Sequence, residues 1–267
     1  MIGLRLWRQR RRILLATTLA GVGGVCVAGN DWQVPVATAL LASALMAITV
    51  VLAPGLRWFV LKMAMVFALC STVYAATGVR LDILAPVGVF GLMLVPSQHR
   101  WLDHYTMPWI HRALASVEIA RSVDAVWQVV RPVPGAPHWD PSVAEVRLGA
   151  EPDGLMLKRR LPDGSLVDQP LQLLDVAPLR YLKIRDRSLS EAGEDGAVTV
   201  TAFRFSGDRE TCRLVLIEAT WRRPLWTAFS LWLDDYLADH ADHMAALIEG
   251  RPDPSLRGAI LRSVGAG

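Results

Sequence analysis

The hydrophobic and polar positions divide the chain into two halves of different character. Up to about residue 96, apolar residues run in long stretches with few charges between them, and these stretches cover residues 13–29, 34–53, 58–76 and 81–96. A helix needs about 20 mostly apolar residues to cross a bilayer. The pattern therefore predicts an all-α membrane region of about four spanning helices. The fourth stretch is short and holds Pro86 and Gly88, so a re-entrant segment is its alternative.

After about residue 115 the period of the pattern changes. Residues 116–121 alternate between polar and apolar side chains, as in a half-buried strand. Ser122 then provides an N-cap for a short helix over 123–130. Further strand-like runs cover residues 143–148, 155–161, 166–176, 181–187, 198–205 and 212–221. The Pro-Asp-Gly-Ser sequence at 162–165 is typical of a tight hairpin turn, which predicts antiparallel neighbours.

One long amphipathic helix is predicted over residues 224–250. Pro224 suits its first turn and Gly250 suits its end. Apolar residues recur between them at three- and four-residue spacing, which predicts one buried face. The aspartates of this helix lie largely off the apolar stripe and predict a solvated acidic face; they are Asp234, Asp235, Asp239 and Asp242.

The order of these elements predicts an α+β domain behind the membrane region. A strand, a short helix, about six antiparallel strands and a long helix follow one another, which is not the alternation of a parallel sheet. We expect a curved antiparallel sheet around the long C-terminal helix. The expected organisation is a membrane region with an interfacial junction over residues 1–112, a compact domain over 113–250 and a tail over 251–267.

Two short motifs in this domain resemble those of a known superfamily. Val126-Trp127 lies in the first short helix, and Trp139-Asp140-Pro141 precedes the second strand. In this order they resemble the START-like superfamily, the SRPBCC group of polyketide cyclase/dehydrase and lipid-transport proteins. The resemblance covers about residues 116–250 and implies a helix-grip fold. It also implies an apolar cavity between sheet and long helix, which relatives use for lipids, isoprenoids or polyketides. No catalytic residue can be transferred from it.

Charge adds an orientation to this picture. Five arginines precede the first apolar stretch, and they are Arg5, Arg8, Arg10, Arg11 and Arg12. Arg57 and Lys62 begin the third stretch. Because cytoplasmic loops carry the excess of Lys and Arg, we expect a bacterial inner-membrane protein with four spans and a cytoplasmic C-terminal domain. With three spans the domain lies on the other side, and a cleaved signal peptide is the alternative for the first stretch.

Composition excludes several classes of function. The net charge is only +3, without the basic face of a nucleic-acid binder, so no nucleic-acid partner is expected. Three cysteines form no CxxC pair, and His240 and His243 have no second source of ligands, so neither a metal nor a cofactor is expected. The oligomeric state is left open by the sequence.

Candidate ligand-binding residues follow from the expected cavity. Apolar pockets use rings and a few polar groups, and His240 falls within the apolar stripe of the long helix, while Arg159 is in phase with the inward residues of its strand. The alternative is that these residues are ordinary core. The candidates are Trp127, Trp139, Arg159, Phe203, Phe205, Trp226, Phe229, Leu233, Tyr236 and His240.

These observations favour a membrane-anchored domain that binds a hydrophobic small molecule, such as a lipid, an isoprenoid or a polyketide-like compound, for transfer or sensing. The first alternative is a cyclase or dehydratase that uses the same cavity, with His240, Tyr236 or Arg159 as acid, base or anion holder. No paired carboxylates or Ser-His-Asp arrangement supports it, and no catalytic residue is assigned. The second alternative is a scaffold or regulatory domain with a closed core.

Overall fold

The computed structural model describes residues 2–29, 31–79, 88, 105–136, 138–160, 164–187 and 198–256. By its internal contacts the chain divides into two compact units. The first comprises Met1–His104 together with the short segment Trp232–Asp235, and the second comprises Tyr105–Leu231 and Tyr236–Gly267.

Three helices of the first unit are long and apolar enough to cross a membrane. They are α2 (Arg10–Ala28), α3 (Gln33–Leu52) and α4 (Arg57–Thr77), preceded by α1 (Ile2–Arg8) and with the 3-10 turn η1 (Pro54–Leu56) between α3 and α4. These helices match the first three predicted spans. The fourth stretch, 81–96, lies outside the described residues except for Gly88.

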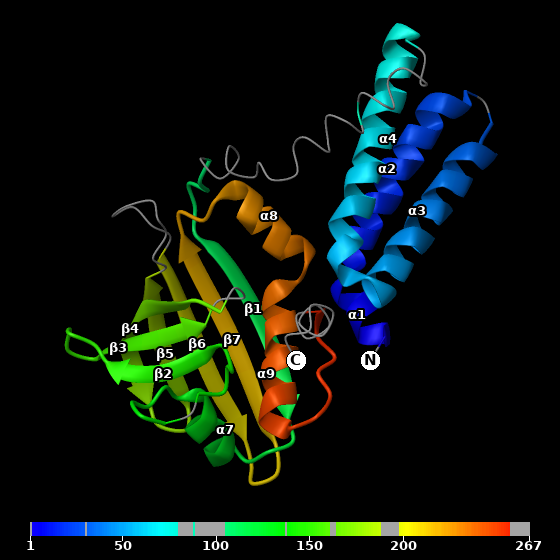
Figure 1. Cartoon of the computed structure of the whole chain (residues 1–267). Helices are drawn as coiled ribbons and strands as arrows, with labels where there is room; N and C mark the ends of the chain where they lie inside the picture. The colour runs from blue at the N-terminus through cyan, green and yellow to red at the C-terminus, as the bar shows by residue number, and fades with distance from the viewer. Residues whose placement is uncertain are drawn as a thin grey trace. The chain divides into compact units, whose positions relative to one another are not determined.

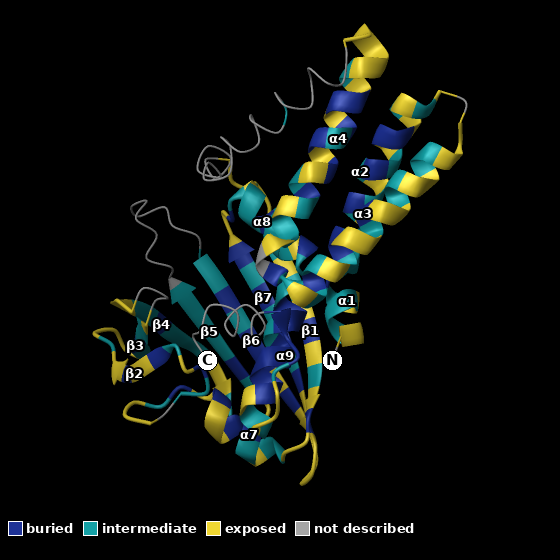
Figure 2. Cartoon of the chain, turned by 45° about the vertical axis from the view of Figure 1, so that its right-hand side comes forward, coloured by how far each residue is buried: buried dark blue, intermediate teal, exposed yellow. Residues whose placement is uncertain are grey.

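Small residues bring these helices together. Helix α2 packs against both α3 and α4 (Figure 1). A Cβ on Gly24 would lie 2.6 Å from the Cα of Pro35, so the glycine is required for this close approach. Large apolar side chains such as Leu14, Leu40 and Leu69 are instead exposed. Figure 2 shows exposed positions along α2, α3 and α4. An apolar exterior is what a lipid environment requires.

The first unit also contains a cluster of arginines and aspartates. Arg12 has no exposed surface, and its Nη2 donates to Asp234 Oδ1 at 2.7 Å. Arg57 Nη2 donates to Asp234 Oδ2 at 3.2 Å, and the Arg12 guanidinium stacks 4.0 Å from the centre of the Trp58 ring. Asp235 lies 3.3 Å from Arg10. Both aspartates therefore neutralise the basic end of the bundle.

This cluster explains one difference from the sequence prediction. The structure divides the helix expected over 224–250 into α8 (Leu225–Leu233) and α9 (Tyr236–Glu249). Asp235 has a φ of 48°, which ends the regular helix. Two adjacent aspartates are weak helix formers, and here their carboxylates bind arginines.

The second unit is built on one seven-stranded antiparallel sheet with the order β1-β7-β6-β5-β4-β3-β2. Its strands are β1 (His111–Ile119), β2 (Val143–Leu148), β3 (Gly154–Arg160), β4 (Leu166–Ala177), β5 (Tyr181–Arg187), β6 (Val198–Gly207) and β7 (Cys212–Trp221). The predicted α+β class and the sheet with C-terminal helices are confirmed. The first strand begins earlier than expected, because residues from His111 onward pair with β7.

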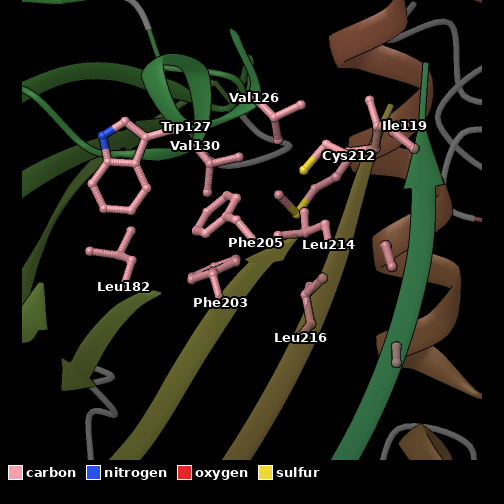
Figure 3. Packing of buried hydrophobic residues seen from close by; sticks show 14 of the residues in the cluster. Ile119, Val126, Trp127, Val130, Leu182, Phe203, Phe205, Cys212, Leu214 and Leu216 are labelled. Carbon is pink, nitrogen blue, oxygen red and sulfur yellow. The ribbon is translucent and has the colours of Figure 1, made fainter. Parts of the chain in front are cut away.

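Helices α7 (Val123–Val130) and α9 cover the same face of this sheet, which we call the inner face (Figure 1). Ser122 is the predicted N-cap, and its Oγ accepts from the backbone amide of Ala125 at 3.3 Å. The core between these elements joins Val126, Leu214 and Met244 from α7, β7 and α9. Figure 3 shows Val126 and Leu214 within this core. Burial of these apolar side chains is the main stabilising contribution to this unit.

The acidic face predicted for the long helix is wrong at two positions. Asp239 and Asp242 are each only 7% exposed. The described part of the tail, residues 251–256, supplies a partner for Asp239: the backbone amide of Leu256 donates to its Oδ1 at 2.6 Å. His243 on the same helix lies 2.5 Å from Asp253. The tail therefore packs on α9, which the helical pattern alone did not indicate.

Candidate functional site

The inner face of the sheet is organised in three rows that run across the strands. The pairing register places Ala115, Leu216, Phe203 and Leu182 in one row. The next row contains Ala113, Glu218, Thr201, Ile184 and Leu173, and the third contains His111, Thr220, Thr199, Asp186 and Leu171. The inner face thus changes from wholly apolar, near α7, to largely polar at its far end.

The first row belongs to a closed core. Trp127 and Phe205 meet edge to face with ring centres 5.2 Å apart, and Phe203 lies beside Phe205 (Figure 3). These three rings are 2%, 5% and 6% exposed, with Leu182 fully buried. Three of the predicted pocket residues therefore pack against one another at this end, as interior side chains do at ordinary packing density.

The second row is only partly covered. Leu173 and Ile184 point to the inner face, yet both are half-buried rather than buried. Thr201, opposite Ile184 on β6, is also half-buried. Helix α9 covers the inner face mainly over β1 and β7, which lie toward the opposite edge of the sheet from β4. Apolar surface therefore remains accessible on the inner face of β4 and β5.

A buried ion pair marks the polar end of the inner face. Arg223 Nη2 donates to Glu218 Oε1 at 2.7 Å and to Thr220 Oγ1 at 2.7 Å. The guanidinium also lies 5.7 Å from the centre of the Tyr236 ring. Burial raises the pKa of Tyr236 above its usual range, and its hydrogen bond to Glu218 adds to this. Burial lowers the pKa of His111, and the nearby charge of Arg223 lowers it further.

The carboxyl group of Asp186, in the third row, has a hydrogen-bond partner for only one of its two oxygens. Gln169 Nε2 donates to Asp186 Oδ2 at 2.5 Å, while Asp186 Oδ1 is buried and has no hydrogen-bond partner. Burial raises the pKa of Asp186, and the hydrogen bond from Gln169 and the charge of Arg159 act in the opposite direction. An unpaired buried oxygen is uncommon in native proteins and calls for a functional or structural reason.

Arg159 and Trp139 approach the inner face from its β2–β3 side. Arg159 lies 3.7 Å from Asp140, and its Nε is buried and unpaired. Trp139 meets His240 of α9 edge to face, with ring centres 5.4 Å apart. Tyr236 and His240, one helical turn apart on α9, therefore both face the interior, as the apolar stripe predicted.

The three candidates from α8 lie elsewhere. Trp226 and Phe229 form a tilted pair with ring centres 5.8 Å apart. Leu233 is fully buried. It belongs to the segment Trp232–Asp235, which is part of the first unit. The helix break is the reason, because the stripe of α8 does not continue in phase through Asp235 into α9.

Several polar residues of the inner face were not among the candidates: His111, Gln169, Asp186, Thr220 and Arg223. One signal for Asp186 was present in the sequence, since it is in phase with Leu182 and Ile184 along its strand. Gln169 is in phase with Leu171 in the same way. Their proximity depends on the register of β4 against β5, which the sequence pattern did not provide.

Two further features complete the picture of the second unit. A pocket of about 180 Å³ lies at strands β3, β4 and β5, and its lining includes Met156, Gln172 and Arg185. These three residues alternate with the inward-facing residues of their strands, so they lie on the outer face of the sheet. Among the described residues, no group of three or more His, Cys, Asp or Glu side chains could hold a metal ion.

No family model matches the chain, and no curated protein matches it. Among solved structures it is similar to the Zhui aromatase/cyclase from Streptomyces sp. R1128, at 17% identity over 60% of this chain and 99% of that chain, with a TM-score of 0.40. It is also similar to a START superfamily protein from Mycobacterium smegmatis, at 16% identity over 52% of this chain and 95% of that chain, with a TM-score of 0.40. The observed strand order and the C-terminal helices agree with the helix-grip fold that the sequence resemblance implies.

Proposed function

We propose that the chain is a membrane-anchored protein whose second unit binds a hydrophobic small molecule on the inner face of its sheet. The half-buried apolar side chains of Leu173 and Ile184 carry this proposal. They point inward, yet they keep accessible surface between a closed core and a polar row. A site of this kind, apolar with a few convergent polar groups, is the usual form of a small-molecule site.

The membrane helices support a ligand that is drawn from the bilayer, such as a lipid or an isoprenoid. A tether keeps the binding unit close to such a source and raises the effective concentration of ligand. Transfer or sensing of a membrane-soluble molecule is the role that combines both units.

The test is to isolate the full chain in a mild detergent, extract its bound lipids and identify them by mass spectrometry. Ile184→Trp fills the accessible part of the inner face, and we expect it to lower the bound amount at least several-fold. Lys183→Trp is the matched control, because the neighbouring residue faces the other side of the same strand. Equal binding in the two variants, or no bound molecule in the unmodified chain, would refute a ligand site at this position.

We also propose four spans in a bacterial inner membrane, with the second unit on the cytoplasmic side. Asp234 binds Arg12 and Arg57, which lie at the same end of the helix bundle as the N-terminal arginines. Arginines gather at this end of the bundle, and the positive-inside rule favours the cytoplasm for it. A fluorescent protein fused to the C-terminus is expected to fluoresce, and alkaline phosphatase at the same point is expected to be inactive.

One observation favours the enzymatic alternative. Asp186, Tyr236 and His111 on the polar part of the inner face all have shifted pKa values, and such groups gather at catalytic sites. If the unit is a dehydratase, incubation with a bound polyketide-like molecule would produce a compound lighter by one water; a cyclase that does not dehydrate its product would instead give an isomer of the same mass and a different retention time. Recovery of every extracted ligand unchanged would leave binding as the function.

A further inference from the structure

We infer that Asp186 and Gln169 form a polar subsite that holds the neutral hydroxyl or carbonyl end of an amphiphilic ligand. This inference rests on the proposed function and adds the direction in which the ligand lies. The polar end would meet the third row of the inner face, and the apolar body would lie along the second row. The site is formed by strands β4 and β5 (Figure 1).

The geometry leaves one oxygen of this carboxyl group without a hydrogen-bond partner. Asp186 lies between Leu171 on β4 and Thr199 on β6. Its Oδ2 accepts from Gln169 at 2.5 Å, which holds the carboxyl group in place, while its buried Oδ1 has no partner. Leaving a buried polar atom unpaired is costly. A ligand oxygen placed against Oδ1 would remove this cost.

The surrounding charges favour a neutral partner. Glu218 and Asp186 face the same interior and influence one another electrostatically. The cations nearby already have anionic partners: Arg223 binds Glu218, and Arg159 lies 3.7 Å from Asp140. A carboxylate or phosphate headgroup would therefore face two carboxyl groups, while the positive charges of these two arginines are already shared with Glu218 and Asp140, which costs affinity.

A carboxyl group can bind either neutral oxygen. Its ionised form accepts a hydrogen bond from a hydroxyl, and its protonated form donates one to a carbonyl. Burial raises the pKa of Asp186, so both forms become accessible closer to neutrality than for a free aspartate. The adjoining row continues with Ile184 and Leu173, whose accessible surface suits an alkyl or isoprenoid chain.

The experiment uses the full chain in lipid nanodiscs and three photoreactive probes of one chain length, which differ only in a terminal alcohol, methyl ketone or carboxylate. After irradiation, peptide mapping separates labels on strands β4 and β5 from labels on the membrane helices. We expect the alcohol and the ketone to label β4 and β5 about fivefold or more above the carboxylate. Asp186→Leu should lower this labelling about tenfold, the loss expected for one buried hydrogen bond.

Two further variants keep the result interpretable. Asp186→Asn retains both a donor and an acceptor and should keep most of the alcohol labelling, even if the leucine variant folds poorly. Asp168→Leu is the matched control, because Asp168 is exposed and lies on the opposite face of β4 from Gln169. Equal labelling by the carboxylate, or equal losses in Asp186→Leu and Asp168→Leu, would overturn the subsite alone. Labels confined to the membrane helices would overturn the subsite and the proposed function together.

Discussion

Arg223 donates a hydrogen bond to Glu218 at 2.7 Å, and both side chains are nearly buried at the polar end of the inner face. The arginine follows the last strand, whereas Glu218 lies within it. The same Nη2 reaches Thr220, and Tyr236 of α9 adds a hydrogen bond to Glu218. This network connects the sheet with the start of α9 and forms one wall of the proposed ligand site.

Removing one member of this pair should be more damaging than removing both. Arg223→Ala leaves Glu218 buried without its partner, and such a loss costs about 3–5 kcal/mol of stability. Replacing the pair together by Glu218→Gln and Arg223→Met should recover most of this loss. The midpoint of thermal unfolding of the full chain measures both effects. A double variant that is less stable than Arg223→Ala would contradict this account of the pair.

Asp186→Asn should stabilise the protein at pH 7. Because burial raises the pKa of Asp186, the folded state holds the proton more tightly than the unfolded state. Its contribution to stability is therefore present at low pH and is lost as pH rises through the folded-state pKa. The amide of the asparagine cannot ionise, so no charge is buried at this position. Single stabilising substitutions typically raise the free energy of unfolding by about 0.5–2 kcal/mol. Unfolding midpoints at pH 4 and pH 7 measure the change, and a larger gain at pH 4 would have the wrong sign.

The contact of His243 with Asp253 predicts a loss of stability in acid. Burial alone would raise the pKa of Asp253, but hydrogen bonds from His243 and Ser255 outweigh it and lower the pKa to about 2. The stabilisation is present above about pH 4, where a free aspartate is ionised, and is lost as pH falls through about 2. Asp253→Asn should cost about 1 kcal/mol at pH 7, after allowance for solvent screening.

The measurement for this prediction is the unfolding midpoint at pH 7, 4 and 2.5. The difference between the variant and the unmodified chain should be much smaller at pH 2.5 than at pH 7. Asp175→Asn provides the control, since Asp175 is an exposed carboxylate on β4. A constant difference across the three pH values would mean that Asp253 acts by packing rather than by its charge.

The closed and accessible parts of the inner face should respond differently to truncation. Trp127→Ala removes a ring that is 2% exposed and packs on Phe205, and a cavity of this kind costs about 3–5 kcal/mol. Ile184→Ala removes a half-buried side chain and should cost about 1–2 kcal/mol, because part of that surface is already solvated. Thermal unfolding of the two variants gives the comparison. Equal losses would mean that Ile184 lies in a closed core.

The arginine cluster of the first unit should depend on Asp234. Arg12 is fully buried there, and Asp234→Ala leaves its charge without the closest carboxylate, at a cost of about 3 kcal/mol. Asp235→Ala is the control and should cost less than about 1 kcal/mol, because the arginines around Asp235 are partly solvated. Melting of the full chain in detergent tests both variants. Similar melting of both variants would argue against the special role of Asp234.

Much of the architecture was determined by the sequence itself. Periodicity is a local property, so the three long apolar helices and the alternating strands, with Ser122 as N-cap of α7, were predictable without tertiary contacts. The same local phase predicted that Tyr236 and His240 face the sheet. It also placed Phe203 and Phe205 inward, although it did not decide whether they line a cavity or fill the core.

The tertiary structure decided how these local elements combine. The break at Asp235 arises because arginines more than 200 positions earlier bind the two aspartates, and no helical pattern contains that contact. The tail similarly binds Asp239 through the backbone amide of Leu256. The row that joins Asp186 to Thr199 and Thr220 depends on strand register, because a shift by one residue would turn each side chain to the other face. Sequence alone thus determines the elements and their faces, while long-range pairing determines which polar groups meet.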